Sequence, residues 1–284
     1  MTENPRRQFL KSAGVALGAS LAFAVPGHSS STERNSSSLQ VWSCGGLAEA
    51  MMPANAKFTE KNGSDIAYTG AFAGALGKSL LTGGAQTEVF APRVLELAQK
   101  LKAQGKMLHY TPLCYTRYVM ITPKGNPAGI ETIEDINKPG IKPVIIPDAS
   151  PPGGLASMVI LKKAGVQEAA IKNAVSKGDC VQTSVPDIIS GKGDVAVVEY
   201  RLTQLPQFKG KVEIIDISEK HYPPAPIPFT IGLMKWAKDR ELAEEYIKFI
   251  LSDAGQQFFQ MAGFIPAGSE EGKRLTAKYG VKDV

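Results

Sequence analysis

The stretch Tyr68–Lys78, YTGAFAGALGK, indicates how this chain folds. The residues that lead into it, Ile66–Tyr68, have the β-branched and aromatic side chains typical of a strand. Its centre, Gly70–Gly74, carries one large side chain, Phe72, as expected of a turn. Leucines at helical spacing follow it, namely Leu76, Leu80 and Leu81. With Glu88–Phe90 as the next strand, the pattern predicts a strand, a small-residue turn, a helix and a second strand.

This turn is a candidate anion-binding site. The first backbone N–H groups of a helix lack partners inside the helix, and the helix dipole places partial positive charge there. Because residues 70–74 are mostly small, a ligand could come within hydrogen-bonding distance of that backbone. Close packing of a helix on a sheet explains the same small residues, so the turn alone leaves both interpretations open.

Composition and charge limit the classes of function. A chain of 284 residues is long enough for one large or two modest domains with proper cores. Its 43% hydrophobic and 21% charged residues are ordinary for a soluble globular protein. The formal net charge of +5 is small and scattered, which argues against a nucleic-acid-binding or membrane-surface protein.

The N-terminus has the features of a targeting segment. Arg6–Lys11, RRQFLK, precedes a mild apolar run, Ser12–Val25, that is too short to span a bilayer, and Ala22–Ala24 offers a cleavage site. The RRxFLK pattern resembles a twin-arginine export signal; an ordinary secretory signal is the alternative. No cysteine follows closely enough for a lipoprotein anchor. We therefore expect residues 1–38 to be a signal peptide and flexible spacer, and the mature protein to be soluble in the periplasm.

Strands and helices alternate twice along the remaining chain, which predicts two α/β lobes with parallel strands. Expected strands are residues 39–43, 66–68, 88–90, 118–122, 143–146, 194–198, 212–217 and 229–234. Expected helices are residues 47–62, 94–104, 131–137, 155–164, 185–190, 239–251 and 253–261. We expect residues 39–116 plus 226–284 to form lobe 1 and residues 117–225 to form lobe 2. Ligands of such sheets bind beyond the carboxyl ends of the strands, where both glycine turns, 44–46 and 70–74, fall.

Several segments in this order resemble one protein family. They are Gly45–Ala50 (GGLAEA), Lys61–Gly63, the turn with Leu76-Gly77, Gly83–Phe90 (GGAQTEVF), Tyr118–Pro123, Pro152–Gly154, Leu251–Gln256 and Gly263-Phe264. The chain resembles, over about residues 39–266, the extracytoplasmic solute-binding proteins of ABC importers, specifically the molybdate-binding branch. The resemblance implies a two-lobed periplasmic-binding-protein fold (type II), each lobe a mixed sheet flanked by helices, with a ligand cleft between the lobes. It also implies a monomer without cofactor or catalytic activity, which delivers a small oxyanion such as molybdate or tungstate to an ABC permease in the cytoplasmic membrane.

The family binds a tetrahedral oxyanion with neutral hydroxyls and backbone N–H groups, and the resemblance places these positions in the present chain. The two serines correspond to Gly46 and to Ala73 or Gly74, the backbone donors to Pro152 or Gly153 and to Val181, and the tyrosine hydroxyl to Glu199 or Tyr200. With their neighbours, the expected ligand-binding residues are Cys44, Gly45, Gly46, Phe72, Ala73, Gly74, Arg93, Ser150, Pro152, Gly153, Cys180, Val181, Glu199 and Tyr200.

The chain departs from the family at the charged and hydroxyl positions. Both serines are missing, and Pro152 has no N–H group, so Gly153 would have to donate. Glu199 would place a carboxylate beside a bound anion, which is costly unless that carboxylate is protonated or paired. Arg93, where the family has an aspartate, is a candidate counter-charge.

Two other classes of function stay open. Thiolates suit soft metal ions, so Cys44, Cys114 and Cys180 with Glu199 are an alternative metal site. The three cysteines cannot all pair with one another, and a disulfide or simple burial of Cys44 and Cys180 is the competing interpretation. A small organic ligand beside Phe72 is a further possibility. A thiol-dependent enzyme would need Cys114 close to His109 or His221. The expected mechanism is hinge closure around residues 114–118 and 222–228.

Overall fold

The computed structural model describes residues 38–147, 153–178, 183–225 and 227–281. The chain divides into Met1–Asn35 and Ser36–Val284, and the description below concerns the second unit. The predicted signal peptide therefore lies outside the described residues. Within the described part of the chain, no helix is both long and apolar enough to cross a membrane.

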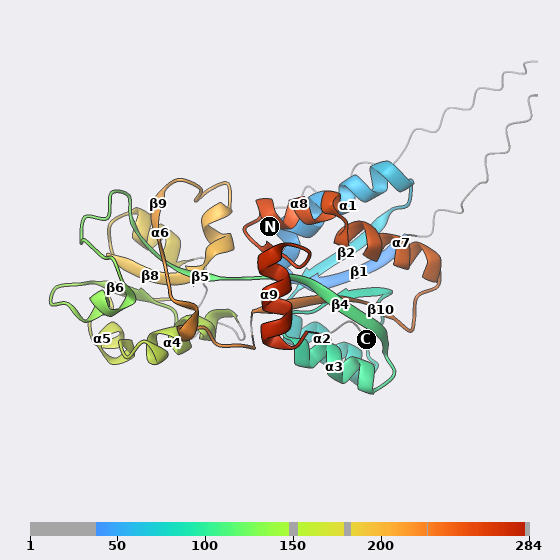
Figure 1. The fold of residues 1–284 in the computed structure, drawn as a ribbon, viewed down its shortest axis with the longest axis horizontal. Helices are drawn as coiled ribbons and strands as arrows, with labels where there is room; N and C mark the ends of the chain where they lie inside the picture. The colour runs from blue at the N-terminus through green and yellow to red at the C-terminus, as the bar shows by residue number, and fades with distance from the viewer. Residues whose placement is uncertain (1–37, 148–152, 179–182, 226, 282–284) are drawn as a thin grey trace, which may run out of the picture. The chain divides into compact units, whose positions relative to one another are not determined.

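The first sheet has six strands in the order β11-β4-β10-β3-β1-β2 (Figure 1). Their bounds are β1 Leu39–Cys44, β2 Ile66–Ala71, β3 Val89–Ala91, β4 Met107–Tyr115, β10 Pro228–Met234 and β11 Ile265–Pro266. Strand β1 is parallel to β2 and to β3, which confirms the predicted β-α-β-α-β start of the chain. Strand β10 is antiparallel to β3 and β4, so the sheet is mixed.

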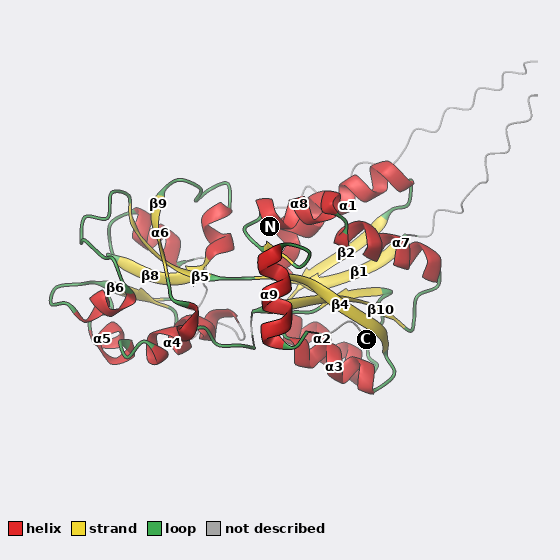
Figure 2. Ribbon diagram, in the orientation of Figure 1, coloured by secondary structure: helices red, strands yellow, loops and turns green. Residues whose placement is uncertain are grey.

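Helices cover both faces of this sheet (Figure 2). The short η1 (Gly45–Leu47) leads into α1 (Ala48–Asn62), which packs with α7 (Arg240–Leu251) and α8 (Asp253–Met261) in one core; its large members include Phe58, Tyr246 and Phe259. On the other face, α2 (Ala73–Thr82) and α3 (Leu95–Ala103) pack in a second core that includes Leu80 and Phe90. The two faces give the layered α/β arrangement that the alternating sequence predicts.

The second sheet has five strands in the order β7-β6-β8-β5-β9. Their bounds are β5 Tyr118–Pro123, β6 Pro143–Ile145, β7 Ser176–Lys177, β8 Val195–Glu199 and β9 Val212–Asp216. Strand β8 is parallel to β6 and antiparallel to β5. The helical segments with this sheet are η2 Ile133–Asn137, α4 Gly153–Lys163, α5 Gln167–Lys172, α6 Ser184–Ile189, η3 Tyr200–Gln204 and η4 Glu219–His221. Two mixed sheets, each flanked by helices, confirm the predicted fold class.

The chain passes from the first sheet to the second after β4 and returns before β10. The two passages are hydrogen-bonded to each other, because the Thr116 N–H donates to the Ile227 carbonyl at 3.1 Å. The last helix, α9 (Glu270–Tyr279), lies beside them: its Leu275 belongs to the same core as Tyr115 and Tyr118.

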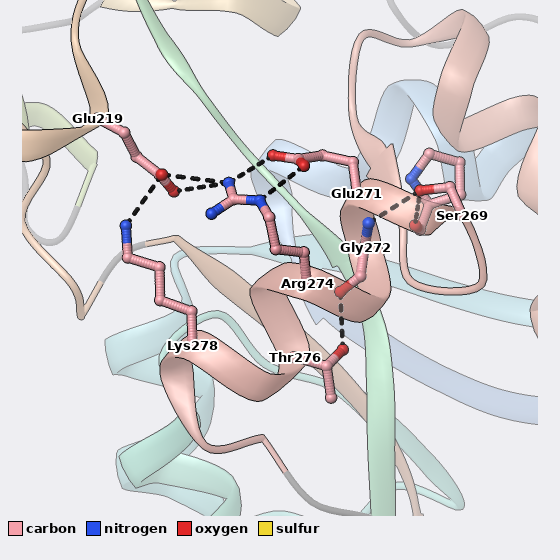
Figure 3. A network of polar contacts seen from close by, with 8 residues as sticks. Glu219, Ser269, Glu271, Gly272, Arg274, Thr276 and Lys278 are labelled. Atoms are coloured by element: carbon pink, nitrogen blue, oxygen red, sulfur yellow. Dashed lines mark hydrogen bonds and ion pairs between the residues drawn. The ribbon is translucent and has the colours of Figure 1, made fainter.

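Helix α9 is also tied to η4 by charge. Figure 3 shows Arg274 between the carboxylates of Glu219 and Glu271, with Lys278 on Glu219 at 3.0 Å. Helix α9 therefore connects the two passages between the sheets to η4, one of the helical segments that accompany the second sheet.

The sequence prediction lacks strand β4 and helices α5 and α9, besides the short β7, β11, η3 and η4. The sequence predicts no element for residues 107–115, because Pro112 weakens the strand pattern of β4, and a register shift interrupts its pairing with β10. Helix α5 is six residues long, too short to show a period. Helix α9 has only a narrow apolar stripe and carries Gly272, whose missing Cβ would lie 2.0 Å from the Pro266 carbonyl oxygen. The two-residue strand β11, which follows Gly263 and Phe264, pairs with β4.

Candidate functional site

The two predicted glycine turns lie at one edge of the first sheet. Because β1 and β2 are parallel and Ser43 is in register with Gly70, both strands end together. Helix α2 starts directly after β2, and its N-cap Phe72 provides no side-chain hydrogen bond to the first N–H groups. The η1 turn after Cys44 likewise has no side-chain cap. The edge therefore presents helix starts that side chains do not cap.

A cavity of about 540 Å³ runs from this edge between α2 and α3. Four of the expected ligand-binding residues line it, namely Phe72, Ala73, Gly74 and Arg93, together with Lys78, Leu81, Thr82, Val94, Glu96, Leu97 and Lys100. Phe72 is half exposed, and its ring lies against the position that a Cβ on Gly74 would take, at 3.0 Å. A larger residue at position 74 would therefore displace this ring.

Val94, in the wall of the same cavity, has an unusual backbone conformation. Its φ of 77° lies in the left-handed region, which a β-branched residue rarely adopts. The conformation is held by a hydrogen bond from the Val94 N–H to the Pro228 carbonyl at 3.3 Å. Backbone strain of this kind is found mostly at functional sites. Val94 lies between β3 and α3, directly after Arg93.

A buried charge cluster occupies the strand ends. At the end of β8, the Glu199 side chain is 1% exposed. One of its oxygens, Oε1, pairs with Arg93 Nη2, and the other, Oε2, accepts from Arg201 Nε at 2.6 Å. Tyr118 joins the cluster by accepting from Arg93 Nη2 at 2.9 Å and donating to Glu199 Oε1 at 3.4 Å. Arg201 also contacts Glu49 Oε1 of α1 at 3.5 Å, so the cluster links both sheets.

Two opposing effects set the protonation of this cluster. Burial tends to raise the pKa of Glu199, but the charges of Arg93 and Arg201 and their hydrogen bonds outweigh it and lower that pKa to about 2. Burial tends to lower the pKa of Arg93, and the Glu199 carboxylate reverses the shift and raises it. At neutral pH, the carboxylate and both guanidinium groups are therefore ionised.

Arg201 occupies the space beside Gly46, one of the positions where the resemblance places a serine. A Cβ on Gly46 would lie 3.2 Å from Arg201 Nη2 and 3.3 Å from Cζ. On its other side, Arg201 Cα lies 2.9 Å from the position that a Cβ on Gly263 would take, and Gly263 has a φ of 88°. Gly46 thus leaves room for the guanidinium where a hydroxyl is expected, and Gly263 leaves room for the backbone of η3.

The structure places the remaining predicted residues as follows. Tyr200 begins η3 and packs under the guanidinium of Arg117, whose Cζ is 3.9 Å from the ring centroid. Gly45 and Gly46 form the η1 turn, and Gly153 begins α4. Ser150, Pro152, Cys180 and Val181 lie outside the described residues.

The thiols and histidines show ordinary structural environments. Cys44 and Cys114 are free and buried, and burial raises the pKa of each thiol. His109 pairs with Glu244 at 2.6 Å, and the buried His221 lies 3.9 Å from Glu134. Among residues 38–147, 153–178, 183–225 and 227–281, no group of three or more His, Cys, Asp or Glu side chains is arranged to hold a metal ion.

Sequence reasoning missed three members of the cluster: Glu49, Tyr118 and Arg201. The available signal was Glu199 itself, because a buried carboxylate requires counter-charges and Arg201 follows it by two residues. Arg93, proposed as a counter-charge, does contact Glu199.

Comparisons with known proteins agree with this architecture. The molybdate-binding protein ModA of Mycobacterium tuberculosis is 23% identical over 195 residues, which are 65% of this chain and 67% of that protein. A substrate-binding domain assigned to a molybdenum ABC transporter of Clostridium difficile is 18% identical, with a TM-score of 0.69 over 81% of this chain and 98% of that one. The periplasmic molybdate-binding protein of Azotobacter vinelandii is also 18% identical, with a TM-score of 0.64 over 80% and 98%.

The structural likeness shows that the two sheets form the two-lobed fold of periplasmic binding proteins. In addition, the model of one family, described as bacterial extracellular solute-binding proteins, matches residues 39–265. The chain belongs to the family of bacterial extracellular solute-binding proteins.

Proposed function

We propose that this protein binds a tetrahedral oxyanion of the molybdate and tungstate type and delivers it to an ABC permease. The observation that carries the proposal is the convergence of two buried guanidinium groups, those of Arg93 and Arg201, at the strand ends beside uncapped helix starts. Guanidinium groups donate several hydrogen bonds in a fixed plane, which suits oxyanions. The names of the relatives, which are molybdate-binding proteins, support the same class of ligand.

The proposed mechanism is hinge closure. Residues 39–116 plus 226–284 would move as one lobe and residues 117–225 as the other, with hinges in residues 114–118 and 222–228. The hydrogen bond between Thr116 and Ile227 supports this choice, because it keeps the two crossing segments together. A permease that binds the closed form better than the open form would select the loaded protein. In this proposal the protein is a periplasmic monomer exported by the twin-arginine route, and it has no catalytic activity.

Thermal unfolding in the presence of candidate ligands tests the ligand class. Molybdate and tungstate are expected to raise the melting temperature, since a ligand present at about 100 times its dissociation constant stabilises the native state by about 2.7 kcal/mol. Chloride at the same ionic strength is the control. A rise confined to zinc, copper or nickel ions, and lost in the Cys180→Ser protein, would reject the oxyanion in favour of a soft metal ion.

The cavity beside Phe72 favours one further candidate, an oxyanion that carries an organic group. This cavity of about 540 Å³ is lined by Arg93 at one point and extends well beyond it, and Leu81, Val94 and Leu97 give it apolar walls. Glycerol 3-phosphate in the same thermal series distinguishes the two: a larger shift than with molybdate would assign the site to an organic phosphate.

A further inference from the structure

The carboxylate of Glu199 makes the contacts that an anionic ligand would need. Each of its oxygens is held by a guanidinium from a different segment, Arg93 after β3 and Arg201 in η3. The Tyr118 hydroxyl adds a donor at 3.4 Å from Oε1. Ionised donors and acceptors in such geometry form the stronger class of hydrogen bond. The strongest anion-binding groups of the site are therefore already engaged by the chain itself.

Much of the positive charge of the cluster is compensated before any ligand binds. Arg93 and Arg201 carry two positive charges, the buried Glu199 carboxylate held by both supplies one negative charge, and Glu49, whose side chain is 31% exposed, lies 3.5 Å from Arg201. A dianion added to this network would leave an excess of buried negative charge, which is strongly unfavourable. A free anion must therefore replace Glu199 rather than join it.

We propose that Glu199 is an internal competitor of the ligand and the residue that sets the selectivity of the site, so that an anion gains Arg93 and Arg201 only by displacing its carboxylate. The inference rests on the proposed oxyanion function. It implies that monoanions such as acetate, which offer the guanidinium groups no more than Glu199 does, are rejected. Tetrahedral dianions, with more charge and more acceptor oxygens, are admitted.

The test is the affinity for sodium molybdate at pH 7, measured by isothermal titration calorimetry on the wild-type and Glu199→Gln proteins. The amide has nearly the same size but no charge, so both guanidinium groups lose their internal anion. Because charge-assisted hydrogen bonds are released for the ligand, the variant is expected to bind molybdate about tenfold tighter or more. A role confined to stability would predict weaker binding instead. Acetate should bind the variant better than it binds the wild type.

A matched control is Glu219→Gln, which removes a carboxylate that is also held by two basic side chains, Arg274 and Lys278, but lies outside the cluster (Figure 3). Its molybdate affinity should equal that of the wild type. A second variant, Glu199→Asp, keeps the charge that compensates the buried arginines but withdraws the carboxylate by one methylene group. It should fold if Glu199→Gln does not, and its affinity should lie above that of the wild type.

The outcomes separate this inference from the proposed function. If the wild type binds molybdate and the variants bind it more tightly, both the inference and the proposed function are supported. Binding by the variants but not by the wild type supports the role of Glu199 and rejects molybdate as the natural ligand. If the wild type binds molybdate and the variants bind it equally well or more weakly, the inference is overturned and the proposed function stands. If none of the proteins binds molybdate, both are overturned.

Discussion

Replacing Arg93 with methionine is expected to lower the free energy of unfolding by about 3–5 kcal/mol, the usual cost of removing one partner of a buried ion pair. Arg93 is 4% exposed and Glu199 1%, so water cannot take over the lost interaction. Methionine keeps most of the side-chain length and limits any cavity over the Phe229 ring, which lies 5.1 Å from Arg93 Cζ. Urea unfolding followed by tryptophan fluorescence measures the loss.

Two further proteins separate the charge from the packing. In Arg93→Met, the Glu199 carboxylate keeps its contact with Arg201 at 2.6 Å, whereas the double variant Arg93→Met with Glu199→Gln also removes the counter-charge of the buried Arg201 and should therefore be less stable than the single variant. The variant Lys124→Met breaks an ion pair with Glu213 in which both side chains are exposed, and should cost at most about 1 kcal/mol. A loss from Arg93→Met no larger than this control, or a double variant more stable than the single one, would contradict the account.

Acid is expected to remove a specific part of the stability. The folded pKa of Glu199, about 2, is lower than its ordinary value near 4.5, so the unfolded state binds a proton first. Its contribution is complete above pH 5 and is lost as the pH falls towards 2. By pH 3 the loss amounts to about 2 kcal/mol, from the linkage between proton binding and folding.

The Glu199→Gln protein isolates this contribution, because other carboxylates titrate equally in both proteins. Urea unfolding of wild type and variant at pH 7, 5, 4 and 3 should show the wild type losing more stability than the variant over this range. Parallel pH profiles would show that Glu199 is not held ionised by Arg93 and Arg201.

The sequence predicts the local elements well where their periodicity is strong. The β-α-β-α-β start follows from leucine spacing and small-residue turns, and the register of β1 with β2 and β3 brings both turns to one edge. Strand β4 cannot be predicted from its local sequence, because Pro112 interrupts the strand pattern and the strand is stabilised by pairing with β10, which is distant in the chain. Helix α9 depends in the same way on packing against Tyr115 through Leu275.

The charge cluster could be predicted only in part. Arg93 is a candidate counter-charge because it replaces an aspartate of the family, but the sequence alone does not show that Arg201 lies against Gly46. That contact joins segments more than 150 residues apart, and it depends on Gly46 leaving room for the guanidinium. The substitution of serine by glycine therefore looks like a loss in the sequence, whereas in the structure it accommodates a charged donor.

Anomalous diffraction from crystals of the wild-type protein grown with tungstate tests the central claim most directly. The account predicts a tungsten peak placed so that the tungstate oxygens lie within hydrogen-bonding distance of the guanidinium groups of Arg93 and Arg201, with the Glu199 carboxylate moved away from them. Saturating tungstate that leaves this position empty, or that binds only elsewhere on the protein, would contradict it.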